Sequence, residues 1–261
     1  MTKKNLKNFA SLLEIMADLR EKCPWDREQT MLSLRTNTIE ECFELVDSIL
    51  NNDKNAIKEE LGDVLLHIVF YSKIAEEEKS FDIGDVIETL CEKLIYRHPH
   101  IYSTTEVSGV DDVKSNWEAL KQKKKKSGGL LSGVPRSMPA LPKATRIGEK
   151  AASVGFDWEK REDVWAKVKE EISELEAEMC EGDSNREKIE SEFGDVFFAL
   201  TNAARLYGID PETALERTNK KFSSRFTYLE DRVRERGVSL RDMSLAEMDA
   251  IWDEAKGLEN K

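Results

Sequence analysis

Apolar residues recur along most of the chain at the spacing of one face of an α-helix. No alternation of apolar and polar residues is long enough to predict a strand, so the pattern predicts an all-α fold. The predicted helices span residues 6–20, 32–50, 55–78, 83–97, 162–180, 187–207 and 245–256, with further helices that begin at Asp111 and at Pro211. Gly182-Asp183 is predicted to form a turn.

Short polar segments separate these helices. Asn51-Asn52-Asp53 predicts a tight turn, so the helices on either side of it should lie antiparallel. The segment Cys23-Pro24-Trp25-Asp26 interrupts the first helical pattern, and Asp26 is predicted to cap the next helical segment. Asp82 and Asp210 are predicted to cap later helices in the same way, and Pro99 should end the helix before it.

Acidic residues recur on one face of each pair of long helices. A spacing of three residues places two carboxylates side by side on a helix. The pattern starts at Glu40 and returns at Glu170, 130 residues later (from 40 to 170). The paired residues are Glu41, Glu44, Glu60 and Asp63 in the first half and Glu171, Glu174, Glu192 and Asp195 in the second. The carboxylates of each half are therefore expected to converge between two helices.

Asp63 indicates what these carboxylates bind. It lies in the run from Leu61 to Phe70, which is apolar on almost all sides, and such a helix is expected to be buried. A buried carboxylate needs a partner, and basic residues nearby are few. Carboxylates without thiol or histidine ligands select hard cations, so Mg²⁺ is predicted, with Mn²⁺ possible. A solvated acidic helix face is the alternative, which the doubled spacing disfavours.

Three residues next to the acidic ones lead to separate predictions, namely Gly62, Gly194 and His67. Gly62 and Gly194 hold the same repeat position, and a helical glycine costs about 1 kcal/mol relative to alanine. Both are therefore expected to permit the close approach of a helix or a ligand. His67 lies one turn after Asp63, but its repeat equivalent is Ala199. His67 is either a core histidine or a residue that supports a metal ligand.

The length of 261 residues suits one large or two small domains, and the internal repeat favours two. We expect an N-terminal helical domain over residues 1–122, a linker over 123–150 and a C-terminal catalytic domain over 151–261. The run Lys121–Lys126 lies at the start of this linker. It is either a solvated charge run or a contact for RNA or another anionic partner.

The formal net charge of −12 argues against broad nucleic-acid binding. The four cysteines are scattered, which indicates neither a zinc site nor a disulfide framework. No signal peptide and no apolar run of membrane-spanning length is present. We therefore expect a cytoplasmic protein with no membrane and no nucleic-acid partner.

A cluster of hard cations commonly serves phosphates, and the chain lacks the glycine-rich P-loop motif. Side chains must then help to hold the phosphates. Lys221 and Arg225 mirror Lys93 and Arg97 of the first half, and Trp252 with Lys256 mirrors Trp117 with Lys121. An aromatic ring beside a cation suits a base or ribose next to a phosphate. The alternative is an amphipathic helix with a core tryptophan and an exposed lysine.

The chain resembles a MazG-type nucleoside triphosphate pyrophosphohydrolase over nearly its whole length. The motifs that carry this resemblance are the doubled acidic pattern, Cys23-Pro24-Trp25-Asp26, Arg97-His98-Pro99-His100, Val154-Gly155-Phe156-Asp157-Trp158 and the segment from Asn219 to Phe226. The resemblance implies two repeated MazG-like helical domains whose bundles are completed by dimerisation, hence a homodimer. It also implies Mg²⁺-dependent hydrolysis of nucleoside triphosphates such as ATP, and of deoxynucleoside triphosphates. The products would be a nucleoside monophosphate and pyrophosphate, with broad base tolerance and with the paired carboxylates as metal ligands.

The second half is expected to be the more active one. Lys167 and Lys188 lie one turn before metal ligands, where the first half has Asn37 and Ala56, an excess that Lys58 partly offsets. The family resemblance points the same way. The predicted catalytic residues are Glu170, Glu171, Glu174, Glu192 and Asp195, and the predicted substrate-binding residues are Lys167, Lys188, Lys221, Phe222, Arg225, Trp252 and Lys256.

Two other interpretations remain open. The chain could be a regulatory or scaffold protein whose metal ions fix helices or sense nucleotides without turnover. Alternatively, one half is catalytic and the other serves assembly, which is compatible with hydrolysis. The apolar segments Val64–Phe70 and Val196–Leu200 favour assembly, because one helix pair cannot cover them.

Overall fold

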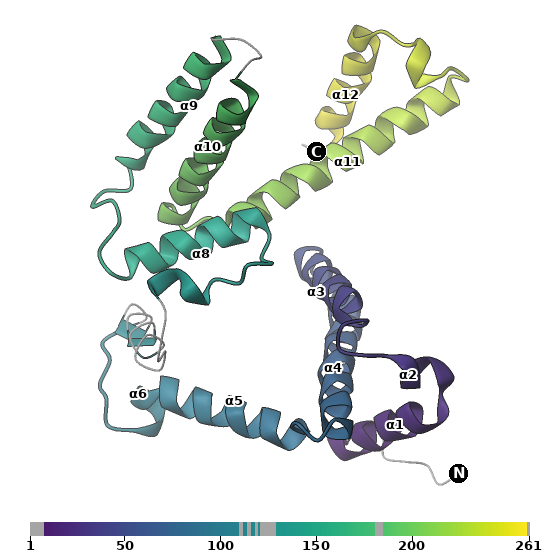
Figure 1. Ribbon diagram of the computed structural model, residues 1–261. Coiled ribbons are helices and arrows are strands. Elements are labelled where there is room, and N and C mark those ends of the chain that lie inside the picture. Colours follow the sequence, from purple (N-terminus) through teal and green to yellow (C-terminus); the bar gives the residue numbers. More distant parts are fainter. Residues whose placement is uncertain are drawn as a thin grey trace. The chain divides into compact units, whose positions relative to one another are not determined.

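The computed structural model describes residues 8–109, 112–113, 116–117, 120, 129–180 and 185–259. Helices and turns account for the regular structure of these residues, and none of them forms a strand, which confirms the all-α prediction (Figure 1). The chain divides into two compact units, residues 1–117 and 118–261. No helix in the described ranges combines the length and the apolar character that crossing a membrane requires.

The first unit is built around an antiparallel helix pair, α3 and α4, on which α1 packs (Figure 1). The predicted turn between α3 and α4 is confirmed. Asn52 adopts a left-handed backbone conformation, with φ of 55°, and the Asp53 side chain accepts hydrogen bonds from the first backbone N–H groups of α4. The helices of this unit are α1 (Phe9–Lys22), α2 (Pro24–Glu28), α3 (Arg35–Leu50), α4 (Lys54–Glu77), α5 (Ile83–Arg97) and α6 (Pro99–Tyr102).

A small apolar core joins α1, α3 and α4. Its most buried members are Met16, Leu34, Val69, Phe70 and Ile74. All but one of these lie on α1 or on the C-terminal half of α4. The core therefore fixes one end of the α3–α4 pair and leaves the acidic segment outside it.

The predicted helix ends are confirmed at Asp82 but not at Asp26. Asp82 caps α5 through a capping box with Asp85. Asp26 lies inside α2, whose N-cap is Cys23, while the N-cap of α3 is Leu34. The reason is Pro24, which takes the first position of α2, where its missing N–H needs no partner. The short helix α6 starts at Pro99 for the same reason and was not predicted from the sequence.

The second unit repeats the antiparallel pair as α9 and α10. Its helices are η1 (Leu130–Gly133), α8 (Ala140–Ala152), α9 (Val164–Cys180), α10 (Arg186–Leu206), α11 (Pro211–Glu235), η3 (Leu240–Asp242) and α12 (Leu245–Glu259). Helix α8 packs on α10, and α12 packs on α11. As predicted, the Asp210 side chain caps α11. One core lies between α9 and α10, and a separate core joins α11 to α12.

Most of helix α8 lies in the stretch, residues 123–150, that the sequence suggested as a linker. Pro139 is its N-cap and Pro142 falls in its first turn, a position that tolerates proline. Three expectations lie outside the described residues: the run Lys121–Lys126, the turn at Gly182-Asp183 and the helix start at Asp111.

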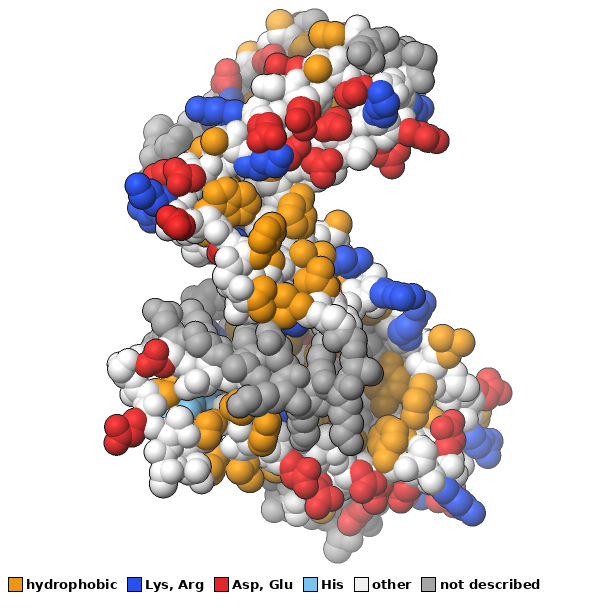
Figure 2. Space-filling view, turned by 60° about the vertical axis from the view of Figure 1, so that its left-hand side comes forward, with side chains coloured by type: hydrophobic (Ala, Val, Ile, Leu, Met, Phe, Trp, Pro, Cys, Tyr) orange, Lys and Arg blue, Asp and Glu red, His pale blue; other side chains and the backbone are white. Residues whose placement is uncertain are grey.

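In the part of the chain that the structure describes, the apolar faces next to the acidic residues are exposed. Leu61 is 53% exposed and Phe197 is 59% exposed, and Asp63 is half-exposed rather than buried. The expectation of a buried Asp63 is therefore wrong for the single chain, because α3 covers only one side of α4. Figure 2 shows hydrophobic side chains gathered in clusters on the surface, near groups of acidic side chains.

Candidate functional site

Three carboxylates meet between α9 and α10. Glu171 of α9 offers one oxygen, and Glu192 and Asp195 of α10 offer one each, all within 4.8 Å of one another. Glu171 is only 7% exposed, Glu192 is half-buried and Asp195 is exposed. The fourth predicted ligand, Glu174, is exposed one turn further along α9 and is not part of this group. The helix pair thus presents a compact acidic cluster with one buried side.

Glu192 has a buried oxygen atom and a perturbed pKa within this cluster. Its Oε2 atom is buried and has no hydrogen-bond partner among the described residues. Burial, and then the charges of Glu174, Asp195 and Glu171, raise the pKa of Glu192. Both effects disfavour the ionised form. A divalent cation would supply the missing partner and would remove the repulsion, so the donor set fits a hard metal ion.

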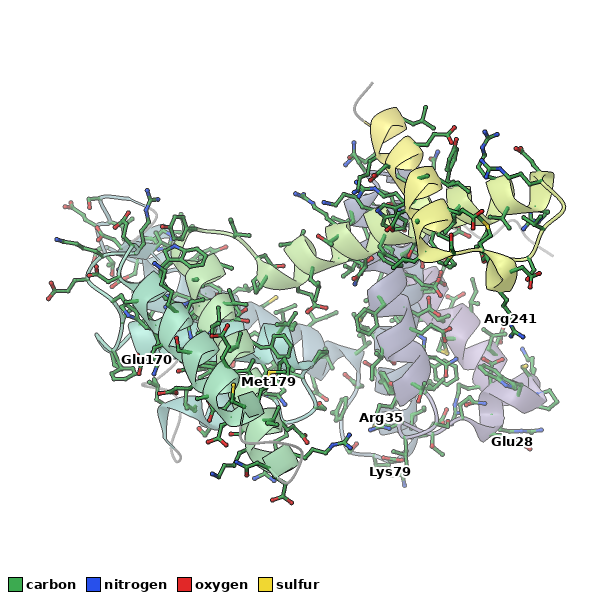
Figure 3. The ribbon with its side chains drawn as sticks, turned by 90° about the horizontal axis from the view of Figure 1, so that it is seen from above. Glu28, Arg35, Lys79, Glu170, Met179 and Arg241 are labelled. Carbon is green, nitrogen blue, oxygen red and sulfur yellow. The ribbon has the colours of Figure 1, made fainter. Side chains whose placement is uncertain are left out.

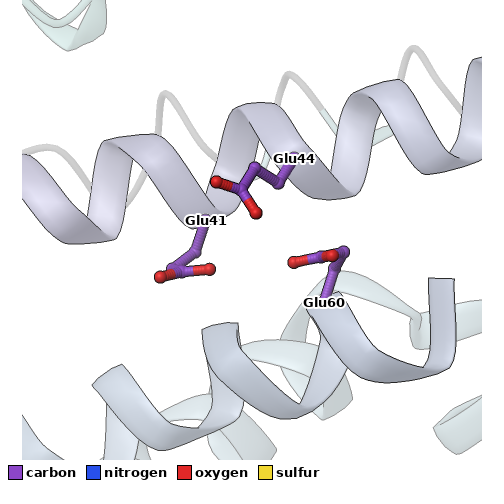
Figure 4. Close-up of side chains that lie close together, drawn as sticks. All are labelled: Glu41, Glu44 and Glu60. Atoms are coloured by element: carbon purple, nitrogen blue, oxygen red, sulfur yellow. The ribbon is translucent and has the colours of Figure 1, made fainter. Parts of the chain in front are cut away.

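The first unit holds a corresponding cluster between α3 and α4. Glu41, Glu44 and Glu60 each offer an oxygen within 4.8 Å of the others, and Figure 4 shows the three side chains facing one another. Burial, followed by the charges of Asp63 and Glu44, raises the pKa of Glu41. The pKa of Glu60 is raised by burial and by the same acidic neighbours. Asp63 is therefore close to the cluster, although it is not one of the three grouped residues.

Lys167 is a feature that distinguishes the second cluster from the first. Its Nζ atom lies 2.9 Å from Glu170 Oε1 and 2.8 Å from Glu171 Oε1. Hydrogen bonds to Glu171 and Glu170 raise the pKa of Lys167, so it is charged at neutral pH. Figure 3 labels Glu170 on α9. As the sequence suggested, a cation lies directly beside the acidic residues of the second unit.

Lys188 is placed differently. Its Nζ atom lies 3.6 Å from Glu178 Oε1, near the end of α9, and its side chain is mostly exposed. Glu178 also accepts a hydrogen bond from Asn185. Lys188 therefore helps to hold the start of α10 against the end of α9.

An aromatic and cationic group forms where α12 packs on α11. The Trp252 ring lies 4.9 Å from the ring of Phe222, and the Arg225 guanidinium lies 5.8 Å from the Trp252 ring centroid. Lys221 is exposed on the same helix, and Lys256 lies 2.9 Å from Asp253. Both Figure 1 and Figure 3 show α12 set apart from α9 and α10. The structure thus brings these residues together, but apart from the carboxylates of the same chain.

The first unit has a related arrangement. The Arg97 guanidinium lies 5.3 Å from the Trp117 ring centroid, and the His98 ring packs edge-on against Trp117 at 4.9 Å. Lys121, the predicted partner of Trp117, lies outside the described residues. The pairing of an arginine with a tryptophan therefore occurs in both units, whereas the sequence had suggested a lysine as the partner of each tryptophan.

His67 belongs to a polar group that sequence reasoning did not find. Its Nδ1 atom lies 3.0 Å from Thr38 Oγ1, which also lies 2.5 Å from the hydroxyl of Tyr71. Burial lowers the pKa of His67. In the second unit the equivalent positions hold Val168, Ala199 and Ala203, which pack as an apolar core. Only the mismatch of His67 with Ala199 in the repeat could have signalled this group.

Among the described residues, no helix packs closely against Gly62 or Gly194. A Cβ atom added at either position would meet no atom within 4 Å. Both glycines therefore face open space beside the acidic residues, and only a ligand or a second molecule could make the expected close approach.

The fold and the two sites define an all-α protein whose paired helices carry two carboxylate clusters suited to a divalent cation. The family model described as "MazG nucleotide pyrophosphohydrolase domain" matches residues 29–102 and 159–229. The chain belongs to this family, and each match contains one of the two helix pairs.

Several relatives extend over nearly the whole chain. The chain is 42% identical to "Nucleoside triphosphate pyrophosphohydrolase/pyrophosphatase MazG" of Thermotoga maritima, over 95% of this chain and 96% of the relative. It is 38% identical to "Nucleoside triphosphate pyrophosphohydrolase" of Escherichia coli strain K12, over 94% and 95% respectively. The protein YabN of Bacillus subtilis is 45% identical over 97% of this chain, which spans 52% of that longer protein.

The raised pKa of Glu192 predicts how the metal-free protein responds to pH. Above the ordinary value of 4.5, the folded protein binds more protons at Glu192 than the unfolded chain does, so stability falls as the pH rises. Glu192→Gln cannot ionise. In EDTA at about pH 7.5, we expect it to have a higher unfolding temperature than the parent. This advantage should shrink as the pH falls toward 4.5.

Thermal unfolding with EDTA and with excess Mg²⁺ measures this difference. Glu192→Gln should also lose most of the stabilisation that Mg²⁺ gives the parent, because a bound ligand stabilises only the state that binds it. Glu190→Gln, an exposed change on the same helix, is the matched control and should alter neither quantity. A variant that is less stable than the parent in EDTA would contradict the repulsion described for Glu192.

Proposed function

We propose that this protein hydrolyses nucleoside triphosphates to nucleoside monophosphate and pyrophosphate, with Mg²⁺ held mainly by the C-terminal carboxylate cluster. The observation that supports this most is the acidic cluster of Glu171, Glu192 and Asp195, with its buried and unpaired Glu192 oxygen. The names of the two relatives that match over nearly their full length support the same reaction.

In the proposed enzyme, Glu171, Glu174, Glu192 and Asp195 hold the cation. Mg²⁺, when bound, supplies positive charge that neutralises the phosphates and polarises the phosphoryl oxygens. The carboxylates would hold the cation between α9 and α10. Glu174 would join the three grouped residues by a rotation of its exposed side chain. The first unit would hold a cation with Glu41, Glu44, Glu60 and Asp63.

Glu170 and Lys167 are proposed to act beside the cation. Glu170 is exposed and accepts a hydrogen bond from Lys167, and we assign it the task of orienting or deprotonating the attacking water. Lys167 has three donors, two of which point to Glu170 and Glu171. The third donor can bind a phosphate oxygen that arrives next to the cluster. Lys188 would reach the phosphates only after leaving Glu178.

The group on α11 and α12 is proposed to bind the nucleotide. Lys221, Arg225 and Lys256 would neutralise the phosphates, while Trp252 with Phe222 would pack on the nucleoside. Stacking depends on the face of a base rather than on its hydrogen-bonding edge. Such a group would tolerate several bases, and both ribose and deoxyribose forms are proposed as substrates.

The reaction gives the first test of this proposal. Purified protein with Mg²⁺ should convert a panel of nucleoside and deoxynucleoside triphosphates to the monophosphate and pyrophosphate, because the site binds phosphates through a cation. EDTA should abolish this conversion, and added Mg²⁺ or Mn²⁺ should restore it. Product analysis by chromatography measures both. Nucleoside diphosphate and orthophosphate as the main products would refute the proposal, and binding without turnover would support a regulatory or scaffold role.

The second test asks which unit is responsible for turnover. An extra ammonium near a bound phosphate contributes on the order of 1–3 kcal/mol, about tenfold or more in rate, and only the second cluster has Lys167. Glu171→Ala or Asp195→Ala should remove most turnover. The matched changes Glu41→Ala or Asp63→Ala should leave much of it.

Initial rates at saturating Mg²⁺ compare these four variants, with circular dichroism and light scattering to show that each is folded and assembled. Equal losses from both sets would mean two comparable sites. Loss from the first set alone would reverse the assignment.

We also propose that the protein is a homodimer. Exposed apolar side chains on α4 and α10, such as Leu61, Leu65, Phe193 and Phe197, need a partner surface, and symmetric dimers are the commonest way to supply one. Light scattering at micromolar concentration should give twice the mass of one chain. Phe197→Glu should weaken the assembly, because it places a charge in the apolar surface. A stable monomer of the parent would refute this proposal.

A further inference from the structure

The segment Val154–Trp158, which has no part in the proposed chemistry, is connected to the end of α10 by a double hydrogen bond. Arg205 donates from Nη1 to Asp157 Oδ2 at 3.0 Å and from Nη2 to Asp157 Oδ1 at 2.6 Å. The two side chains are only 14% and 23% exposed. A two-point contact between guanidinium and carboxylate is strong and also fixes geometry. It joins residues that are 48 positions apart in the sequence.

Further contacts of the Arg205 guanidinium, apart from those with Asp157, hold it in one orientation. Its Nε atom donates to Asn202 Oδ1 at 3.2 Å, and the buried Asn202 in turn donates to the Phe198 carbonyl at 3.3 Å. Gly148 of α8 lies directly against these groups. A Cβ atom at Gly148 would lie 2.4 Å from Asn202 Oδ1 and 2.9 Å from Arg205 Nε. Helix α8 therefore lies so close to the arginine that any side chain at Gly148 would force these groups to move.

The Asp157 side chain is also fixed by a contact with its own segment. Its Oδ1 atom accepts the backbone N–H of Trp158 at 3.0 Å. The Trp158 side chain packs against the apolar core between α9 and α10, which includes Val164, the first residue of α9. The contact of Asp157 with Arg205 consequently ties the start of α9 to the last turn of α10.

The acidic cluster lies between this tie and a second one. At the opposite end of the hairpin, Glu178 contacts Asn185 and Lys188. Between the two ends, Glu171 must stay within 4.8 Å of the oxygens of Glu192 and Asp195. Like charges at this separation repel each other and push the helices apart. The ties at both ends oppose that movement.

We propose that Asp157 and Arg205 are positioning residues for the C-terminal carboxylate cluster. Their contact holds α9 and α10 at the spacing at which Glu171, Glu192 and Asp195 can share one divalent cation. They act through the two helices and do not touch the cation. This inference rests on the proposed function of that cluster as a metal site.

The first unit provides a matched control. Arg20 of α1 donates to Glu77 at the end of α4, at 3.0 Å from Nε to Oε1, and to the backbone carbonyls of Asp26 and Gln29 ahead of α3. This arginine ties together the corresponding elements of the first unit with different residues. Arg20→Met should disturb that unit and leave the spacing of α9 and α10 unchanged.

Mn²⁺ binding, measured by electron paramagnetic resonance on the full chain, tests the inference. In this experiment the parent protein carries Glu41→Ala and Glu44→Ala, which remove two carboxylates of the first cluster. The measured Mn²⁺ binding is then binding to the second cluster. Arg205→Met and Asp157→Asn should each raise the Mn²⁺ dissociation constant about tenfold, the lower end of what the loss of an outer positioning group costs a metal site. The reversed pair Asp157→Arg with Arg205→Asp should recover part of this loss, and Arg20→Met should have no effect.

Folded variants that bind Mn²⁺ as tightly as the parent would overturn the inference, and so would an equal loss from Arg20→Met. If Arg205→Met does not fold, Asp157→Asn decides, because it keeps a hydrogen-bond acceptor for Arg205. Turnover gives a second measurement, in which the half-saturating Mg²⁺ concentration should rise more than kcat falls. A parent that binds Mn²⁺ but hydrolyses no triphosphate would refute the proposed reaction and leave the positioning role standing. A parent that binds no Mn²⁺ would refute the metal site and the positioning role together.

Discussion

Mutual repulsion of carboxylates across a helix pair is the constraint on which both units depend. Three acidic oxygens lie within 4.8 Å of one another in each unit, and burial together with the charges of acidic neighbours raises the pKa of Glu192 and of Glu60. Such an arrangement is unfavourable in the absence of a cation. The helices that carry it must therefore be held together by contacts elsewhere, and the acidic face must remain open to the ion that would relieve it.

The packing of each unit meets this requirement at the ends of the helices. Apolar cores lie beyond the acidic segments, around Phe70 in the first unit and around Val168 in the second. Arginines then tie the segments before α3 and α9 to the last turns of α4 and α10. The middle of each helix pair is left with acidic residues on one face and uncovered apolar residues beside them. Stability and site geometry thus come from different parts of the same two helices.

Much of this arrangement could be predicted from the sequence, because helical spacing and paired acids are local signals. The long helices, the turn at Asn51–Asp53 and the facing of Glu171 with Glu192 follow from such spacing. Contacts between distant segments could not be predicted, and Asp157 with Arg205 is the clearest case. Exposure was also misjudged at Asp63, because a run of apolar residues does not reveal whether its cover comes from the same chain.

The residues one helical turn from the two clusters limit which helices could be exchanged between the units. The first unit has a hydrogen-bonded polar group made of Thr38, His67 and Tyr71. The equivalent residues of the second unit are apolar and are Val168, Ala199 and Ala203. A chimera that replaced α3 by α9 alone would leave the buried His67 facing Val168 instead of the Thr38 hydroxyl. A buried polar group that loses its hydrogen-bond partner costs about 1–3 kcal/mol. The helices of each pair can therefore be exchanged between the units only together, so recombination within the repeat would have to respect whole pairs.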